Sequence, residues 1–283
     1  MSAALAAEDV LARVSELPPL PQAIREINRA LDDEDVCLDE FARKIAIDPA
    51  LVAKILRAAN SPFYGMSGSI GSVRDAVRLV GLRTVGSLLT TAAVTHAIAP
   101  PDCEGFDFQA FWGHSLATAI CSQQLAQECG YSQSLAFTAG LLHDIGRLAL
   151  ASYYPRELAA VLARARDDDC FAFEAEIAIL GIGHAEVGAM IAARWHFAEA
   201  VVDAIRRHHD LMRDETREPL DLADIVHTAD GIAYALDLTR TADDMVPPLD
   251  LAAWQRLGLA PEFYLRLFER AEAAYRELRE ALI

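Results

Sequence analysis

The sequence contains few cysteines, and their spacing argues against both a disulfide framework and a zinc ribbon. The five cysteines are odd in number and scattered, and no two of them are separated by two residues. This pattern is typical of a reducing compartment, so we expect a cytoplasmic location. The N-terminus also lacks the basic stretch and apolar run of a signal peptide, because its first charged residues, Glu8 and Asp9, are acidic.

The sequence is also poor in basic residues and has no long apolar segment. It contains 25 Lys and Arg residues and 42 Asp and Glu residues, which gives a formal net charge of −17. Such a surface repels phosphate backbones and anionic lipid, so we expect no general nucleic-acid binding. The longest uncharged runs, Thr84–Pro101 and Phe108–Gln127, contain His, Thr and Gln, whereas a transmembrane helix needs about 20 predominantly apolar residues. We therefore expect no membrane insertion.

Alternating β-branched patterns, which predict strands, are scarce. Most segments instead repeat apolar residues at i, i+3 and i+4, and Ala and Leu dominate them. A chain of 283 residues with 53% hydrophobic residues can form one large domain or two modest ones. We predict an all-α protein in which an N-terminal helical subdomain packs on a second helical core, followed by a C-terminal helical extension.

Proline and glycine divide the helical chain. Leu17–Pro21 (LPPLP) blocks a helix, and Asp48-Pro49 predicts an N-cap and first helical residue for a helix over Ala50–Ala59. A break near Pro100–Asp102 separates the two subdomains, which are expected to meet near residues 98–107. After it, the apolar periodicity predicts helices at Phe108–Cys129, Ser132–Tyr153, Pro155–Arg166, Cys170–Leu180, His184–Trp195, Ala198–His209, Leu220–Leu238 and Asp250–Leu257, and a last helix from Pro261.

Seven of the eight histidines follow residue 100. His143 and Asp144 adjoin in a strongly apolar stretch, where an unpaired carboxylate is expensive to bury. One or two divalent metal ions would compensate Asp144, because a shared aspartate can bridge two ions. Imidazole and carboxylate ligands suit Fe, Mn, Zn or Ni better than Mg. The candidate metal ligands, each expected at a helical position, are His114, His143, Asp144, His184, His208, His209 and Asp230.

A structural polar network is the alternative for these positions. Buried histidines often bond to backbone carbonyls, and Asp144 could pair with one of them. For any single residue this interpretation is the simpler one, whereas the ordered set H…HD…H…HH…D favours a metal site. His196 and His227 are expected to satisfy local polar contacts.

Several motifs in both halves of the chain are similar to those of one family. They are LPPLP at 17–21, DPAL at 48–51, ANSPFYG at 59–65, AVRLVG at 76–81, FWGHS at 111–115, GLLHDIG at 140–146, HAEVGA at 184–189 and HHD at 208–210. The chain resembles the HDOD domain, an HD-related output domain of bacterial signalling proteins in the HD superfamily of metal-dependent phosphohydrolases. The resemblance implies an HDOD domain over residues 10–210, with an N-terminal subdomain at about 10–100 and an HD-like core at about 106–210. Residues 211–283 would be a helical extension that completes the core.

The resemblance implies a regulatory module in signal transduction that acts through a signalling protein partner, with a His/Asp cluster that binds metal but is not a competent hydrolase. Related HD-GYP cyclic-di-GMP phosphodiesterases have Lys at the place of Arg147 and a Gly-Tyr-Pro segment at the place of Asp210–Glu215. Both departures argue against cyclic-dinucleotide hydrolysis. The alternative is a metal-dependent phosphohydrolase or phosphodiesterase acting on a nucleotide or cyclic dinucleotide, with Asp144 and Arg147 as the catalytic candidates.

Overall fold

A computed structural model describes residues 7–14, 49–61, 70–82, 85–86, 88–90, 100–209, 219–239, 246–247 and 249–282. The regular secondary structure of these residues is helical, and no strand occurs among them. The predicted all-α class is therefore confirmed. Some predicted features lie outside the described residues, namely the LPPLP segment, Asp48, the second half of the ANSPFYG motif and the segment Asp210–Glu215.

The chain divides into two compact units. The first comprises residues 1–18 and 99–264, and the second comprises residues 19–98 and 265–283. Helix α1 (Ala7–Val14) belongs to the first unit, whereas α16 (Pro261–Leu282) begins in the first unit and lies mostly in the second. The predicted limits of the HDOD domain and of its C-terminal extension remain predictions.

In the second unit, α4 (Pro49–Ala59) packs against α5 (Val73–Val80). Asn60, in the ANSPFYG motif, joins them: its side-chain amide donates to the carbonyls of Leu56 and Ile70 and accepts from the Ile70 N–H, all at 2.8–2.9 Å. Ser72 then caps α5 by accepting from the Asp75 N–H at 3.1 Å. One asparagine thus closes the connection between the two helices.

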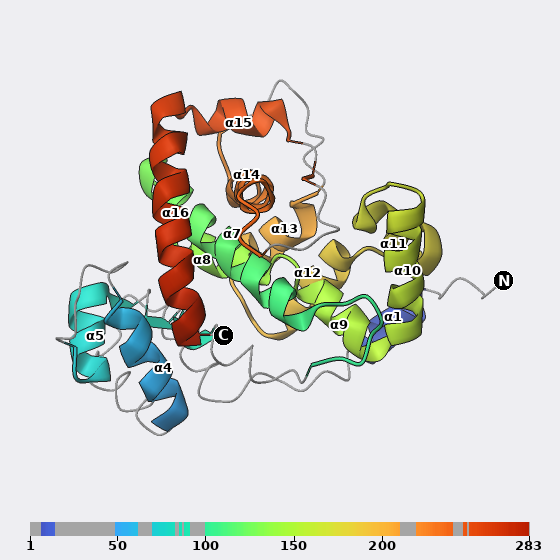
Figure 1. Ribbon diagram of the computed structural model, residues 1–283, viewed down its shortest axis with the longest axis horizontal. Coiled ribbons are helices and arrows are strands. Elements are labelled where there is room, and N and C mark those ends of the chain that lie inside the picture. Colours follow the sequence, from blue (N-terminus) through green and yellow to red (C-terminus); the bar gives the residue numbers. More distant parts are fainter. Residues whose placement is uncertain are drawn as a thin grey trace. The chain divides into compact units, whose positions relative to one another are not determined.

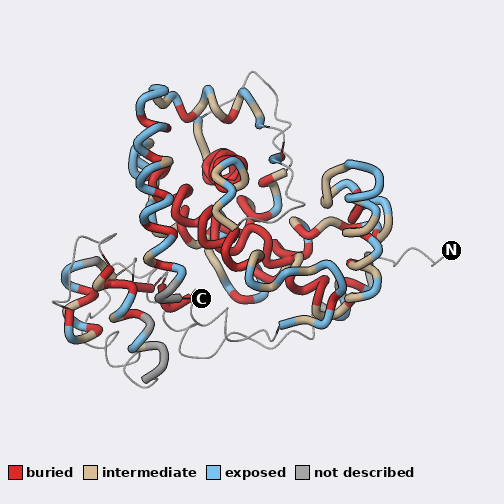
Figure 2. Tube along the Cα trace, in the orientation of Figure 1, coloured by how far each residue is buried: buried red, intermediate tan, exposed pale blue. Residues whose placement is uncertain are grey.

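Helices α7 (Phe108–Glu128), α8 (Gln133–Leu142) and α14 (Leu222–Ala235) form the centre of the first unit (Figure 1). Both α7 and α14 are buried along most of their length (Figure 2). Asp107 starts α7 by accepting two backbone N–H groups at 2.9 Å, and Asp221 with Asp224 starts α14 as a capping box. These caps fix where each buried helix begins, and both helices carry candidate ligands.

Six further helices complete the described part of the first unit. They are α9 (Ile145–Tyr153), α10 (Pro155–Asp167), α11 (Ala172–Leu180), α12 (His184–Arg194), α13 (Glu199–Arg207) and α15 (Leu251–Leu257). Pro155, at the first position of α10, and Gly181, which ends α11 at a positive φ of 71°, mark two of the turns between them. Helix α12 packs against both α9 and α13.

The prediction of one continuous helix over Ser132–Tyr153 is wrong. Helix α8 ends at Leu142 and α9 begins at Ile145, with a turn at His143 and Asp144 between them. The turn accompanies a close backbone contact between α9 and α12. A Cβ on Gly146 would overlap the carbonyl oxygen of His184 and lie 2.7 Å from the Gly188 nitrogen. The His-Asp pair therefore occupies a helix-helix turn, not the middle of a helix.

Among the described residues, no single helix is long and apolar enough to cross a membrane. Helices α11 and α12 meet the requirement together, on length and composition alone, but the chain bends by 83° between them.

Candidate metal centre

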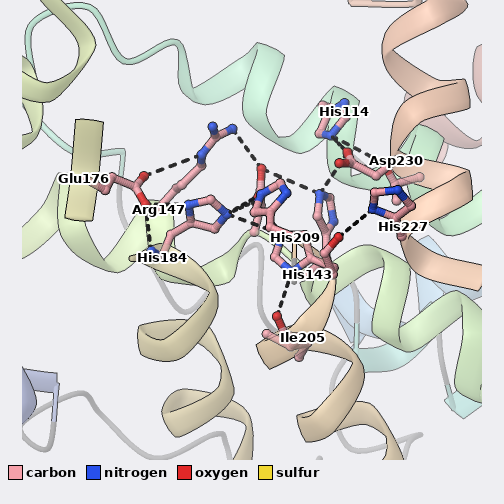
Figure 3. Close-up of polar contacts among 12 residues, drawn as sticks. His114, His143, Arg147, Glu176, His184, Ile205, His209, His227 and Asp230 are labelled. Carbon is pink, nitrogen blue, oxygen red and sulfur yellow. Dashed lines mark hydrogen bonds and ion pairs between the residues drawn. The ribbon is translucent and has the colours of Figure 1, made fainter. Parts of the chain in front are cut away.

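The structure brings all seven side chains predicted as metal ligands into one cluster in the first unit (Figure 3). The rings of His143 and His208 have their centroids 5.1 Å apart, and those of His114 and His143 are 5.3 Å apart. Six of the seven residues are buried, and His209 is partly exposed. The candidate ligands come from α7 (His114), the α8–α9 turn (His143 and Asp144), the start of α12 (His184), the end of α13 (His208 and His209) and α14 (Asp230).

Four of these residues form what we call the first group: Asp144, His184, His208 and His209. Their ligand atoms all lie within 4.8 Å of one another. His184 Nε2 is 3.0 Å from Asp144 Oδ1, 3.3 Å from His208 Nε2 and 3.0 Å from His209 Nε2. Ligands about 2.0–2.1 Å from a tetrahedral ion are roughly 3.3 Å apart. The spacing of the first group is therefore close to that of a four-coordinate metal site.

The second group consists of His114 and His143 with Asp144 as a shared member, and Asp230 lies beside it. His143 Nε2 is 3.6 Å from Asp144 Oδ2 and 3.4 Å from Asp230 Oδ1. Asp230 Oδ1 is in turn 2.8 Å from His114 Nε2. The two carboxylate oxygens of Asp144 therefore face different groups.

The imidazole orientations fit a metal site. His143 and His208 each direct Nδ1 at the carbonyl oxygen of the residue three positions earlier, at 2.7 and 2.6 Å. Their Nε2 atoms are thereby turned into the cluster. His143 Nε2 is buried and has no hydrogen-bond partner, which is unusual for a buried polar atom. A divalent ion that accepts nitrogen and oxygen ligands would satisfy it, so the residues present fit such an ion.

Two polar residues of the site, the buried Glu176 and the half-buried Tyr234, escaped the sequence analysis. Glu176, on α11, accepts from the His184 N–H at 2.7 Å and contacts His184 Nδ1 at 2.6 Å. Tyr234 lies four residues after Asp230 on α14, and its hydroxyl accepts from Arg147 at 3.3 Å. The available signals were weak: an acid in the apolar stretch AFEAEIAIL, and an i, i+4 relation to a candidate ligand.

Arg147 connects these residues to the cluster. Its Nη1 donates to Asp144 Oδ2 at 3.0 Å and to the Tyr234 hydroxyl at 3.3 Å. Its Nε forms an ion pair with Glu176 Oε1 at 3.8 Å. Figure 3 shows the guanidinium between Glu176 and the centre of the cluster, on the side away from His114 and Asp230.

The local charges shift the pKa values in opposite directions. Burial alone would raise the pKa of Asp144, but Arg147 and His143 beside it hold that pKa well below its usual range. Burial opposes a charge on His184, yet Glu176 and Asp144 outweigh burial and raise its pKa to about 9. Burial lowers the pKa of both His208 and His209. Within the first group, burial therefore favours the neutral form of His208 and His209, whereas the carboxylates beside His184 favour its protonated form.

His227 has a local structural role, as expected from the sequence. Its Nδ1 donates to the carbonyl of His208 at 2.8 Å, and its Nε2 accepts from the Asp250 N–H at 3.0 Å. The ring thereby links the end of α13 to α14 and to the start of α15.

An open cavity of about 700 Å³ leads to the cluster. Asp144, Arg147 and His209 reach its wall, and Phe173 stacks on the His209 ring with centroids 4.6 Å apart and planes 21° apart. The cluster is therefore accessible to a small molecule from one side.

Comparison with known proteins identifies the family. A family model of the HDOD domain matches residues 17–211. This chain belongs to the HDOD domain family. The HDOD match contains six of the seven clustered residues, and the seventh, Asp230, follows it.

Several proteins are similar to this HDOD chain. A crystal structure of a candidate phosphohydrolase from Shewanella amazonensis SB2B is 30% identical, with a TM-score of 0.75 and coverage of 97% of this chain and 98% of that one. The MmoQ response regulator from Methylococcus capsulatus strain Bath is 33% identical, with a TM-score of 0.50 and coverage of 89% and 98%. An uncharacterised protein from Treponema pallidum is 30% identical over 207 residues. That match covers 72% of this chain but 40% of the Treponema protein, so the chain spans less than half the length of this curated relative.

Proposed function

We propose that this chain is a regulatory module of bacterial signal transduction that acts through contact with a signalling protein. Its His/Asp cluster binds divalent metal but does not support efficient phosphodiester hydrolysis. Membership in the HDOD family and similarity to a response regulator support the signalling role. A cytoplasmic location is part of the proposal, and it agrees with the free state of the four cysteines among the described residues.

The engagement of Arg147 carries the proposal against hydrolysis. A phosphoryl group in a hydrolase is held by a cation that is free to bind its oxygens. Arg147 lies beside Asp144, where a phosphate-binding cation would be needed. Its guanidinium, however, already contacts two carboxylates and the Tyr234 hydroxyl. A substrate phosphate would have to displace these contacts. Loss of one such electrostatic anchor costs about 10²–10³ in rate.

A metal-dependent phosphohydrolase acting on a nucleotide or cyclic dinucleotide is the second candidate. The seven candidate ligands lie in one cluster, and a cavity of about 700 Å³ reaches it. A similar structure is that of a candidate phosphohydrolase. These observations make activity worth testing directly.

The test measures turnover of cyclic-di-GMP and of the linear dinucleotide by protein loaded with Mn²⁺. We expect no turnover near 1 s⁻¹, the low end of ordinary enzymes. The variants are Asp144→Asn and, as a matched control, Asp168→Asn, which changes an exposed aspartate. Metal-dependent turnover of about 1 s⁻¹ or faster that Asp144→Asn abolishes and Asp168→Asn retains would overturn the regulatory proposal in favour of the hydrolase.

Binding of the chain to a signalling protein is tested by a separate measurement. Cross-linking in cells of the source organism identifies neighbouring proteins, and each is then purified and titrated against the full chain. The proposal expects a signalling protein that binds with the same affinity to wild type and to Asp144→Asn. Failure of every purified candidate to bind wild type would count against it.

A further inference from the structure

We propose that Phe173 is a positioning residue of the cluster: its ring holds the imidazole of His209 in the orientation that lets His209 Nε2 bind an ion in the first group. This inference rests on the metal-binding part of the proposed function. It concerns the orientation of one ligand and is independent of which group binds its ion more tightly. It gives a role to an aromatic residue outside the set of candidate ligands.

Three other histidines of the cluster are oriented through Nδ1. His143 and His208 direct Nδ1 at backbone carbonyls, at 2.7 and 2.6 Å. His184 Nδ1 contacts the carboxylate of Glu176 at 2.6 Å. A metal-binding histidine normally has such a partner on the nitrogen that does not face the metal. Among the described residues, none forms a hydrogen bond with Nδ1 of His209.

The polar contact of His209 does not replace such a partner. It joins His209 Nε2 to His184 Nε2 at 3.0 Å. Both atoms belong to the first group, so both would face the same ion, and the contact would be lost when the ion binds. The Cβ–Cγ torsion of histidine is also a soft one. The ring of His209 therefore needs another contact to keep its plane.

Phe173 provides this contact. Its ring stacks on that of His209, with centroids 4.6 Å apart and planes 21° apart. The neighbouring imidazoles of His184 and His208 are instead tilted by 89° and 46° to His209. Turning the His209 ring about its Cβ–Cγ bond would drive one edge into the face of Phe173, because the two rings are already in contact. The stack therefore restricts the rotation that would turn Nε2 away from the ion.

Helix α11 holds Phe173 beside the cluster. The Phe171 ring, which precedes α11, is nearly parallel to that of Phe173, at 10° and 5.6 Å. Glu176, three residues after Phe173, lies on the same side of the helix and contacts His184 at 2.6 and 2.7 Å. One helix thus orients two histidines of the first group, His184 through a carboxylate and His209 through a ring.

The position of His209 in the chain makes this support important. Helix α13 ends at Arg207, so His209 lies two residues beyond it. Its side chain is partly exposed, whereas those of His184 and His208 are buried. A partly exposed side chain beyond a helix end loses more rotamer freedom when it binds an ion, and a neighbour that already restricts the ring reduces this loss.

Calorimetric titration of the metal-free full chain with Mn²⁺ measures the contribution of Phe173. The ion that His209 binds is identified as the one whose affinity falls in His209→Gln. Phe173→Leu removes the ring but keeps an apolar side chain, and it should weaken the same ion by about 3–10-fold. Phe173→Tyr keeps the ring and should bind this ion within about twofold of wild type.

Two controls separate positioning from general damage to the fold. Phe106→Leu is the matched control, because Phe106 is also half-buried and lines the same cavity but contacts the Phe111 ring. It should leave the Mn²⁺ affinities unchanged within about twofold. In the His209→Gln background, Phe173→Leu should no longer weaken the ion, because the ring it orients is gone. An equal loss with and without His209 would show a structural role only and refute the proposal.

Imidazole NMR of the metal-free protein gives a readout that does not depend on metal. The signals of His209 are those missing in His209→Gln. The face of the Phe173 ring should shift them upfield in wild type, and they should move downfield in Phe173→Leu but not in Phe106→Leu. Unchanged His209 signals in a folded Phe173→Leu would overturn the proposed stack.

The remaining outcomes distinguish this inference from the proposed function. Wild-type protein that binds no Mn²⁺ would overturn the metal centre itself. Wild-type binding that His209→Gln leaves unchanged would overturn His209 as a ligand and, with it, the role of Phe173. Wild-type binding that falls in His209→Gln but not in Phe173→Leu would overturn the role of Phe173 alone.

Discussion

Gly146→Ala should damage the candidate metal centre, although Gly146 has no side-chain atom that could bind metal. Gly146 allows the first turn of α9 to approach the first turn of α12, and these turns carry Asp144 and His184. A Cβ at this position would overlap the His184 carbonyl oxygen and lie 2.7 Å from the Gly188 nitrogen. Both neighbours are backbone atoms, so no side-chain rotation can relieve the overlap.

The size of the effect follows from these distances. Nonbonded atoms of this kind prefer a separation of about 3.5 Å, so α9 and α12 must separate by at least about 0.8 Å. Asp144 Oδ1 and His184 Nε2, now 3.0 Å apart, would then move apart by a similar distance. Overpacking of this kind costs about 1–3 kcal/mol, which for a unit of this size lowers Tm by about 2–12 °C. A shift of almost 1 Å between two ligands should also weaken metal binding by about tenfold or more.

The assay combines thermal unfolding of the metal-free protein with a Mn²⁺ titration. Gly183→Ala is the matched control, because it also adjoins His184 but its Cβ would meet only ordinary contacts, at 3.7 Å from Ile177 and 3.8 Å from Glu176. We expect the control to keep the wild-type Tm within about 2 °C and the wild-type metal affinity. The reasoning is refuted if Gly146→Ala matches wild type in both measurements, or if both variants lose metal affinity equally.

Three other predictions concern Glu176, His184 and the ion pair of Arg256 with Asp224. Glu176→Gln should lower Mn²⁺ affinity by about 10–100-fold, because Glu176 orients His184 through Nδ1; titration of this variant beside Glu174→Gln measures the loss. The pKa of His184 is raised to about 9 in the metal-free fold. The protonated ring therefore contributes its whole share of the free energy of unfolding below pH about 6.5, and this contribution is lost as the pH rises through about 9. Because metal must displace this proton, the gain in Tm on adding Mn²⁺ should increase from pH 6.5 to pH 9. Arg256→Gln should destabilise the fold by about 3–5 kcal/mol in urea unfolding, because it leaves buried Asp224 without its ion-pair partner, at 2.6 Å.

Each of these predictions has a contradicting outcome. Equal losses in Glu176→Gln and the exposed Glu174→Gln would show that Glu176 has no special role. A metal-induced gain in Tm that falls between pH 6.5 and pH 9 would contradict the proton competition at His184. For Arg256, the control is Arg206→Gln, which breaks an exposed pair with Glu186 and should cost at most about 1 kcal/mol. Equal costs for the two arginines would contradict the importance of burial.

The all-helical fold and the seven clustered residues could be predicted because they depend on local or ordered signals. Apolar periodicity and caps such as Asp107 and Asp250 mark helices directly in the sequence. The ligand set was found because histidine and aspartate recur in a specific order at intervals that suit neighbouring helices. Their role as metal ligands stays a prediction.

The remaining features depend on contacts between distant segments. No proline or helix-capping residue precedes Asp144 to mark the break between α8 and α9 in the sequence. The break accompanies the close approach of Gly146 to the backbone of His184, 38 residues later in the chain. Glu176 and Tyr234 were missed for the same reason, because their significance comes from His184 and from Arg147, which is 87 residues from Tyr234. Sequence periodicity identifies a buried face, but it does not identify the residue that meets it from another helix.

Anomalous diffraction from crystals of the full chain grown with one equivalent of Mn²⁺ tests the central claim, that the cluster is a divalent metal centre, most directly. The account predicts at least one strong anomalous peak inside the cluster, bound by the first group or by the second group. Crystals with ordered side chains at all seven candidate ligands and no anomalous peak among them would contradict it.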